Sequence, residues 1–177
     1  NQSGHPVILD PLVAGASQLR TDTTFRLLEE IKFTVIRGNI SEIKTVYSGS
    51  GSTKGVDADV ADVVTEDNLE ETVAFAKELS KTTGAIIAIT GAIDVIADEK
   101  QAYAVRNGVA AMSRITGTGC MLDAVIAGYV TANTDNKVKA VVAAIAAEGL
   151  CGEIAARKLE AEGSGTSSFR MHLIDAM

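Results

Sequence analysis

Residues 116–120 read Thr-Gly-Thr-Gly-Cys and directly precede an apolar stretch that begins with Met121 and Leu122. This pattern predicts a glycine-rich turn at the N-terminus of a helix. Free backbone N–H groups and the positive end of the helix dipole make such a turn a suitable cradle for phosphate or developing negative charge. Glycines let the backbone approach a ligand closely, although glycine before a helix is equally common in plain turns.

Cys120, at the end of this turn, is the candidate catalytic residue. A helix N-terminus favours the thiolate form of a cysteine, so Cys120 can accept a proton as a general base. The alternative is a small buried hydrophobic residue at a helix start, which is the usual role of cysteine. Cys151 lies within an Ala-rich stretch, and we expect it in the core.

Polar side chains also stand at or just after the ends of short apolar runs. Asp10 and Glu42 offer the one or two carboxylates that Mg²⁺ takes from a protein, and Arg37 can donate a pair of hydrogen bonds to a phosphate. The alternatives are ordinary ones. A carboxylate in such a place also serves as a turn former or helix cap, Arg37 as a surface ion-pair partner, and Thr90 before a glycine as part of a generic turn.

These side chains must be positioned by strands and helices that alternate along the chain. The apolar runs 6–10, 33–37 and 85–90 each stop at a polar residue, as buried parallel strands do. Helix-like stretches at 21–32, 41–47 and 66–83 separate them, which predicts an α/β fold with ligands beyond the carboxyl ends of the strands. Residues 94–98 and 102–105 predict a hairpin at the sheet edge, and residues 117–131, 136–162 and 167–177 predict helices.

Length and composition fit a single domain over residues 1–177, since the chain is 46% hydrophobic and 22% charged. An apolar strand begins almost at residue 1, so we expect the chain to lack the front of its fold. The formal net charge of −7 argues against a nucleic-acid partner. No apolar run approaches the roughly 20 residues that cross a bilayer and no signal-peptide pattern is present, so we expect no membrane partner and a cytoplasmic location.

Several separated motifs, taken together, are more specific than the glycine-rich turn alone. They are Val7-Ile8-Leu9-Asp10-Pro11, Ile36-Arg37-Gly38-Asn39 with Ser41-Glu42-Ile43, Lys54-Gly55-Val56-Asp57, Ile89-Thr90-Gly91 with Asp94, and residues 116–120. In this order they resemble the hydroxyethylthiazole kinase family, from about residue 6 to the C-terminus. The resemblance implies a ribokinase-like three-layer α/β sandwich with a mostly parallel central sheet and an edge hairpin.

The same resemblance implies an activity and a set of site residues. The activity is ATP- and Mg²⁺-dependent phosphorylation of the hydroxyethyl group of 4-methyl-5-(2-hydroxyethyl)thiazole, in thiamin biosynthesis or salvage, by a homotrimer with active sites at subunit interfaces. The resemblance also implies that the family's N-terminal portion is absent from these 177 residues. The implied roles are Cys120 as catalytic base, Arg37 and Thr90 on ATP, Gly117 on the alcohol, Thr118 and Gly119 in an anion-hole loop, and Asp10 and Glu42 on the metal.

The chain departs from the family pattern at two places. Val13 stands where the family often has glycine, and Thr166 lies in a segment where Gly-Pro-Gly-Ser-Phe is expected. Three alternatives remain open: another ribokinase-like enzyme, such as a pyridoxal-type kinase or an ATP-dependent hydrate dehydratase; a nucleotide-binding protein without catalysis; and a structural α/β domain. The related enzymes are expected to have aspartate at position 120, so the cysteine favours the thiazole kinase.

Overall fold

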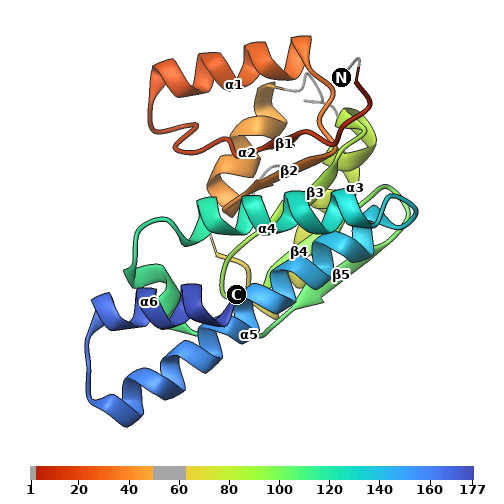
Figure 1. The fold of residues 1–177 in the computed structure, drawn as a ribbon. Helices are drawn as coiled ribbons and strands as arrows, with labels where there is room; N and C mark the ends of the chain where they lie inside the picture. The colour runs from red at the N-terminus through yellow and green to blue at the C-terminus, as the bar shows by residue number, and fades with distance from the viewer. Residues whose placement is uncertain (1–2, 50–62) are drawn as a thin grey trace. The chain divides into compact units, whose positions relative to one another are not determined.

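A computed structural model describes residues 3–49 and 63–177 of the chain (Figure 1). The sequence motif at residues 54–57 lies outside the described residues. The chain divides into two compact units, Asn1–Ala104 and Val105–Met177. The single domain expected from the chain length stays a prediction.

The first unit contains a five-stranded sheet in the order β1-β2-β3-β4-β5 (Figure 1). Strands β1 (Ile8–Leu9), β2 (Val35–Gly38) and β3 (Ile86–Ile89) are parallel, whereas β4 (Asp94–Ala97) runs antiparallel to β3. Strand β5 (Ala102–Val105) lies at the edge beside β4. The predicted α/β class, the three parallel strands and the edge hairpin are therefore confirmed.

The three helices of the first unit lie where the sequence predicts them, with shifted ends. They are α1 (Gln18–Glu30), α2 (Ile40–Gly49) and α3 (Leu69–Thr83). Helix α3 begins three residues later than predicted because Asn68 organises a turn before it. The Asn68 side chain accepts the Thr65 N–H at 2.8 Å and donates to the Val63 carbonyl at 2.8 Å.

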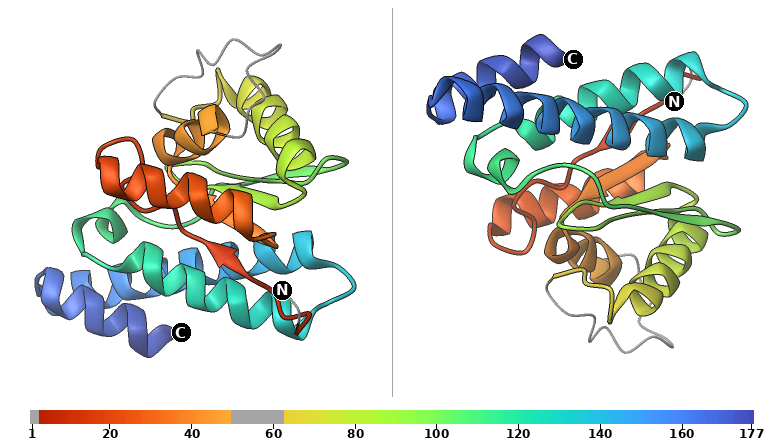
Figure 2. Two further views of the ribbon diagram at one scale, coloured as in Figure 1. Left: turned by 90° about the horizontal axis from the view of Figure 1, so that it is seen from above. Right: turned by 90° about the horizontal axis from the view of Figure 1, so that it is seen from below.

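Side chains alternate across the strands and so define two faces of the sheet. Ile36, Ile87 and Val95 belong to one hydrophobic cluster that also includes the buried residues of α2 and α3, so both helices cover this face (Figure 2). Arg37, the neighbour of Ile36, projects from the opposite face. The parallel order places the carboxyl ends of β1, β2 and β3 along one edge of the sheet.

The second unit is helical and also confirms the predicted stretches. It contains the short 3₁₀ helix η1 (Ala110–Arg114), α4 (Thr118–Ala132), α5 (Lys137–Glu162) and α6 (Thr166–Ala176). Helix α5 packs against α4, α6 and η1. Cys151 contacts the buried cluster around Phe169 and Leu173, but it is half-buried rather than enclosed, and its thiol donates to the Ala176 carbonyl at 3.1 Å.

Candidate functional site

Asp10 and Arg37 form an ion pair at the carboxyl edge of the sheet. Ile8 pairs with Val35 and Leu9 with Ile36, so the parallel register continues to bring Asp10 opposite Arg37 on the same face. Arg37 Nη2 donates to Asp10 Oδ2 at 2.7 Å. The two side chains expected to contact ATP and a metal ion are therefore direct neighbours.

Burial decides between two interpretations of Arg37. Its side chain is only 6% exposed and that of Asp10 18%, so the pair is not the surface salt bridge that we considered as an alternative. Removing one member of a buried ion pair leaves the other charge uncompensated, which is strongly destabilising. Arg37 and Asp10 are therefore structurally coupled to each other, whatever ligand they contact.

Glu42 belongs to a capping box at the start of α2. Asn39 Oδ1 accepts the Glu42 N–H at 2.9 Å, and Glu42 Oε2 accepts the Asn39 N–H at 2.9 Å. This reciprocal arrangement is encoded locally, by Asn39 followed three residues later by a glutamate. The helix-cap alternative for Glu42 is thus realised in the structure, and Asn39, which we did not assign to the site, is its partner.

The second oxygen of Glu42 reaches the turn that follows Asp10. Glu42 Oε1 accepts the Val13 N–H at 2.9 Å, across 29 residues of sequence. Val13 has a φ of 64°, and it is the one non-glycine residue with positive φ among the described residues. The family's glycine at this position now has a physical reason, because a β-branched side chain rarely adopts this conformation.

Thr90 lies directly beyond β3 at the same edge. Its N–H and its hydroxyl both donate to the Gly38 carbonyl, at 2.9 Å and 3.4 Å. The next residue, Gly91, donates its N–H to Asp94 Oδ1 at 2.9 Å. Thr90 is thereby held against the end of β2, within the same edge as Arg37.

Asp94 is the residue of this edge that the sequence reasoning did not assign. Burial raises its pKa from 3.8 to about 6, and the hydrogen bond from Gly91 offsets part of that rise. Perturbed carboxylates are common at functional sites, although structural networks perturb them as well. The sequence signal was present, because Asp94 follows Gly91 by three residues and a short aspartate side chain can close such a turn.

The glycine-rich turn lies in the second unit and has the predicted geometry. Gly117 is the N-cap of α4 with a φ of 104°, and Thr118, Gly119 and Cys120 form the first turn. The Met121 N–H donates to the Gly117 carbonyl at 2.9 Å, whereas N–H groups in a helix's first turn have no intrahelical acceptor. Cys120 is exposed, which excludes the buried hydrophobic role considered for it.

The carboxylates of the first unit are compatible with Mg²⁺. Among the described residues, no group of three or more His, Cys, Asp and Glu side chains is arranged to hold a metal. Mg²⁺ does not require such a cage, because it keeps several waters and binds through one or two carboxylates together with substrate phosphates. Asp10 fits this mode, and the Glu42 carboxylate is bonded to the N–H of Val13, which lies three residues after Asp10.

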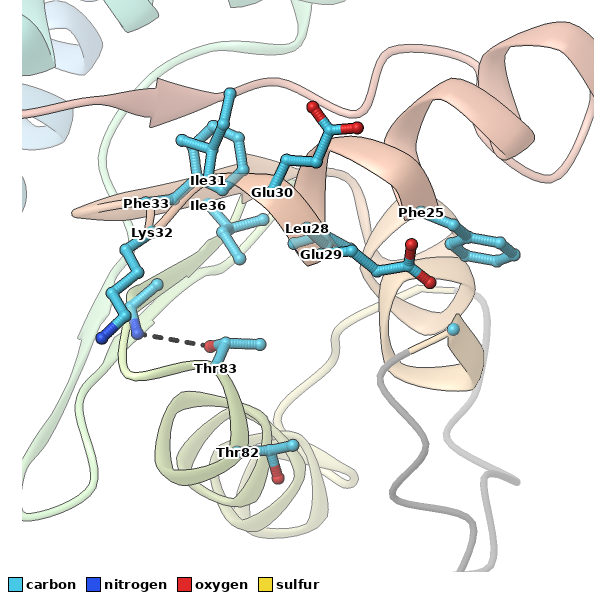
Figure 3. Close-up of a pocket in the computed structure, with 12 residues that line it drawn as sticks. Phe25, Leu28, Glu29, Glu30, Ile31, Lys32, Phe33, Ile36, Thr82 and Thr83 are labelled. Carbon is cyan, nitrogen blue, oxygen red and sulfur yellow. Dashed lines mark hydrogen bonds between the residues drawn. The ribbon is translucent and has the colours of Figure 1, made fainter. Parts of the chain in front are cut away.

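A cavity of about 390 Å³ in the first unit lies elsewhere (Figure 3). Phe33 and Ala85, which line it, precede β2 and β3, so it opens at the amino ends of these strands. The Thr83 hydroxyl accepts the Ala85 N–H there at 3.3 Å. Of the described residues that line the cavity, none is a predicted site residue, so this cavity is separate from the carboxyl edge.

Comparisons with known proteins agree with the family resemblance. The model of the hydroxyethylthiazole kinase family matches residues 1–177. A hydroxyethylthiazole kinase from Clostridium acetobutylicum is 58% identical over 99% of this chain and 64% of its own length. A hydroxyethylthiazole kinase from Desulfovibrio desulfuricans is 44% identical over 100% of this chain and 65% of its own length. The chain thus spans just under two thirds of the curated relatives that it matches.

Solved structures agree with the fold. The hydroxyethylthiazole kinase protein of Pyrococcus horikoshii OT3 matches with a TM-score of 0.81 and 30% identity, over 99% of this chain and 60% of that one. A member of the UPF0031 family from Bacillus subtilis matches with a TM-score of 0.59 and 22% identity, over 97% and 55%. These neighbours have the ribokinase-like fold, which confirms that prediction. With the family match extending over every residue, this chain belongs to the hydroxyethylthiazole kinase family.

Proposed function

We propose that this protein transfers the γ-phosphoryl group of ATP to the hydroxyethyl arm of 4-methyl-5-(2-hydroxyethyl)thiazole, with Mg²⁺, in thiamin biosynthesis or salvage. The observation that carries the proposal is the polar edge of the parallel strands, where Arg37 and Asp10 pair at 2.7 Å and Thr90 is fixed beside β2. Family membership supplies the substrate class.

The roles follow from what each group can do. Arg37 carries a permanent charge and planar donors that suit phosphate oxygens, and Thr90 adds a hydroxyl at the same edge. Asp10 is the carboxylate assigned to Mg²⁺, with Glu42 holding the adjacent turn and able to assist through its remaining lone pairs. When bound, Mg²⁺ supplies charge neutralisation for the phosphates, which is the main requirement of phosphoryl transfer.

The proposal assigns the alcohol to the glycine-rich turn. Gly117 contacts the alcohol, the N–H groups of Thr118 and Gly119 face developing negative charge, and the exposed Cys120 takes the hydroxyl proton. The N-terminal position of these groups on α4 supports the assignment, because helix N-termini favour anions. A homotrimer, as the family resemblance implies, completes the proposal, and analytical ultracentrifugation tests it.

The test measures phosphorylated thiazole alcohol by mass spectrometry after incubation of the 177-residue chain with ATP, Mg²⁺ and the alcohol. We expect product that requires all three, and much less product from Arg37→Ala. Arg26→Ala is the matched control, because Arg26 forms an exposed ion pair with Glu30 on α1. ATP binding without product would instead support the nucleotide-binding alternative, and folded protein that binds no ATP would reject both.

None of the described helices has both the length and the apolar character needed to cross a membrane.

A further inference from the structure

The turn between β3 and β4 is held at its two ends by different parts of the sheet. Thr90 donates to the Gly38 carbonyl at the end of β2, and Gly91 donates to Asp94 at the start of β4. The antiparallel register pairs Ile89 with Val95, so it continues to place Asp94 opposite Thr90. The hydrogen bond from Gly91 therefore closes the turn directly beside the residue assigned to ATP.

Packing anchors this turn at Ile93, which is buried in the hydrophobic core, but not at the two residues before it. Gly91 and Ala92 are exposed, and a Cβ built on Gly91 would meet only the Ile93 carbonyl, at an ordinary 3.8 Å. In the described part of the chain, the Asp94 carboxylate accepts the Gly91 N–H and so restrains the exposed half of the turn.

The surroundings of Asp94 make its charge costly to the fold. Burial raises its pKa to about 6, and the lowering contribution comes from the Gly91 N–H rather than from a charged side chain. Val95 belongs to the cluster under α2 and α3, so its neighbour Asp94 projects from the opposite face of the sheet, from which Arg37 also projects. On that face β3 carries no titratable residue and β5 carries Tyr103. The titratable residues of α3 lie across the sheet from Asp94: Glu70, Glu71, Lys77, Glu78 and Lys81. A neutral Asn would keep an acceptor for Gly91 without this cost.

We propose that Asp94 is a positioning residue, which holds the Thr90–Gly91 turn through the Gly91 N–H in the conformation that receives a nucleotide phosphate. The inference rests on the proposed function, because it assumes that ATP binds at the carboxyl edge. Asp94 acts through Gly91 and does not touch the nucleotide. Its ionised form is the stronger acceptor, because hydrogen bonds to a charged group are about twice as strong as neutral ones.

The opposite pH dependences of stability and binding give the proposal its test. The pKa of Asp94 rises on folding, so the folded chain binds a proton that the unfolded chain has already released between about pH 4 and 6. The stability contributed by Asp94 is therefore fully present below about pH 4 and is lost as the pH rises through about 6. Nucleotide binding should gain over the same rise, because ionised Asp94 holds the turn better.

The experiment measures the Kd of a fluorescent ATP analogue with Mg²⁺, and the Tm, for wild type and Asp94→Asn between pH 5 and 8. At pH 8 we expect the variant to bind about 10-fold more weakly and to melt about 3–8 °C higher. The difference in Kd should vanish towards pH 5, where folded Asp94 is protonated, whereas the difference in Tm should shrink there and vanish only below about pH 4. Comparing the two proteins at each pH cancels the titration of the nucleotide phosphates.

Asp98→Asn is the matched control, because Asp98 closes the turn at the other end of β4. Its Oδ1 accepts the Lys100 and Gln101 N–H groups, each at 2.7 Å. We expect this variant to lose stability and to keep the wild-type Kd. Equal or tighter binding by folded Asp94→Asn at pH 8 would overturn the inference alone. Absence of nucleotide binding by the wild type at every pH would overturn the proposed function as well.

Discussion

Val13 offers a test of how the turn after Asp10 is built. Its φ of 64° is the left-handed conformation, which costs an L-residue about 1–2 kcal/mol. The Glu42 carboxylate holds its N–H at 2.9 Å, and this bond is made by the backbone, so it survives substitution of the side chain. The strain of this conformation should therefore reverse the usual effect of glycine, so that at position 13 glycine does not destabilise the fold relative to alanine.

Leu12 is the matched position. It is 42% exposed and Val13 is 40% exposed, but Leu12 does not have a positive φ. Changing Ala to Gly at an ordinary position destabilises by about 0.5–1 kcal/mol, because glycine loses more conformational freedom on folding. At position 13 the same change also relieves the left-handed strain. The Ala-to-Gly response should therefore be about 1–2 kcal/mol more favourable at 13 than at 12.

The assay is urea unfolding of four variants, Leu12→Ala, Leu12→Gly, Val13→Ala and Val13→Gly, followed by circular dichroism. Comparing Ala with Gly at each position removes the loss of the original side chain, which is similar at the two sites. We expect Gly to destabilise relative to Ala at 12 and to stabilise or leave stability unchanged at 13. An equal loss at both positions would show that Val13 is not held in the left-handed conformation in solution.

Three further predictions concern the proposed chemistry. Arg37→Ala should weaken ATP binding and also lower the free energy of unfolding by about 2 kcal/mol, because the buried ion pair with Asp10 is lost. A double-mutant cycle with Asp10→Asn measures the coupling between the two residues, and an unchanged KM for ATP would count against the assignment of Arg37 to ATP. Asp10→Asn should lower activity, with partial recovery at higher Mg²⁺, whereas a loss insensitive to Mg²⁺ that accompanies unfolding would indicate a structural role. Cys120→Ala should lower kcat by about 10²–10⁴-fold while ATP still binds, and Cys120→Asp should retain more activity than Cys120→Ala. Equal single-turnover rates for the protein with Cys, Ala or Asp at position 120 would eliminate Cys120 as the base.

Arg37 combines a proposed phosphate contact with a structural role. Its side chain is only 6% exposed and pairs with Asp10 at 2.7 Å, so Arg37→Ala removes a buried ion-pair partner as well as a phosphate donor. Activity measurements on Arg37 variants therefore need a stability measurement beside them.

Local sequence patterns were enough to predict the strands and helices and the sheet edge at which polar groups gather. Buried parallel strands appear as apolar runs, so β1, β2 and β3 were predictable, and the carboxyl ends of such strands necessarily share one edge. The capping box was also local, because Asn39 and Glu42 are neighbours on one helical turn. Gly117 at the start of α4 was predictable for the same reason.

Tertiary structure decided which of these groups meet. Asp10 and Arg37 are 27 residues apart, Glu42 and the Val13 N–H 29, and Thr90 and the Gly38 carbonyl 52. Such pairs depend on strand register, and a shift of one residue would turn Arg37 to the other face of the sheet. The raised pKa of Asp94 likewise results from burial, which no local sequence pattern encodes. Local patterns specify periodicity and turns, whereas register and desolvation exist only once the chain is packed.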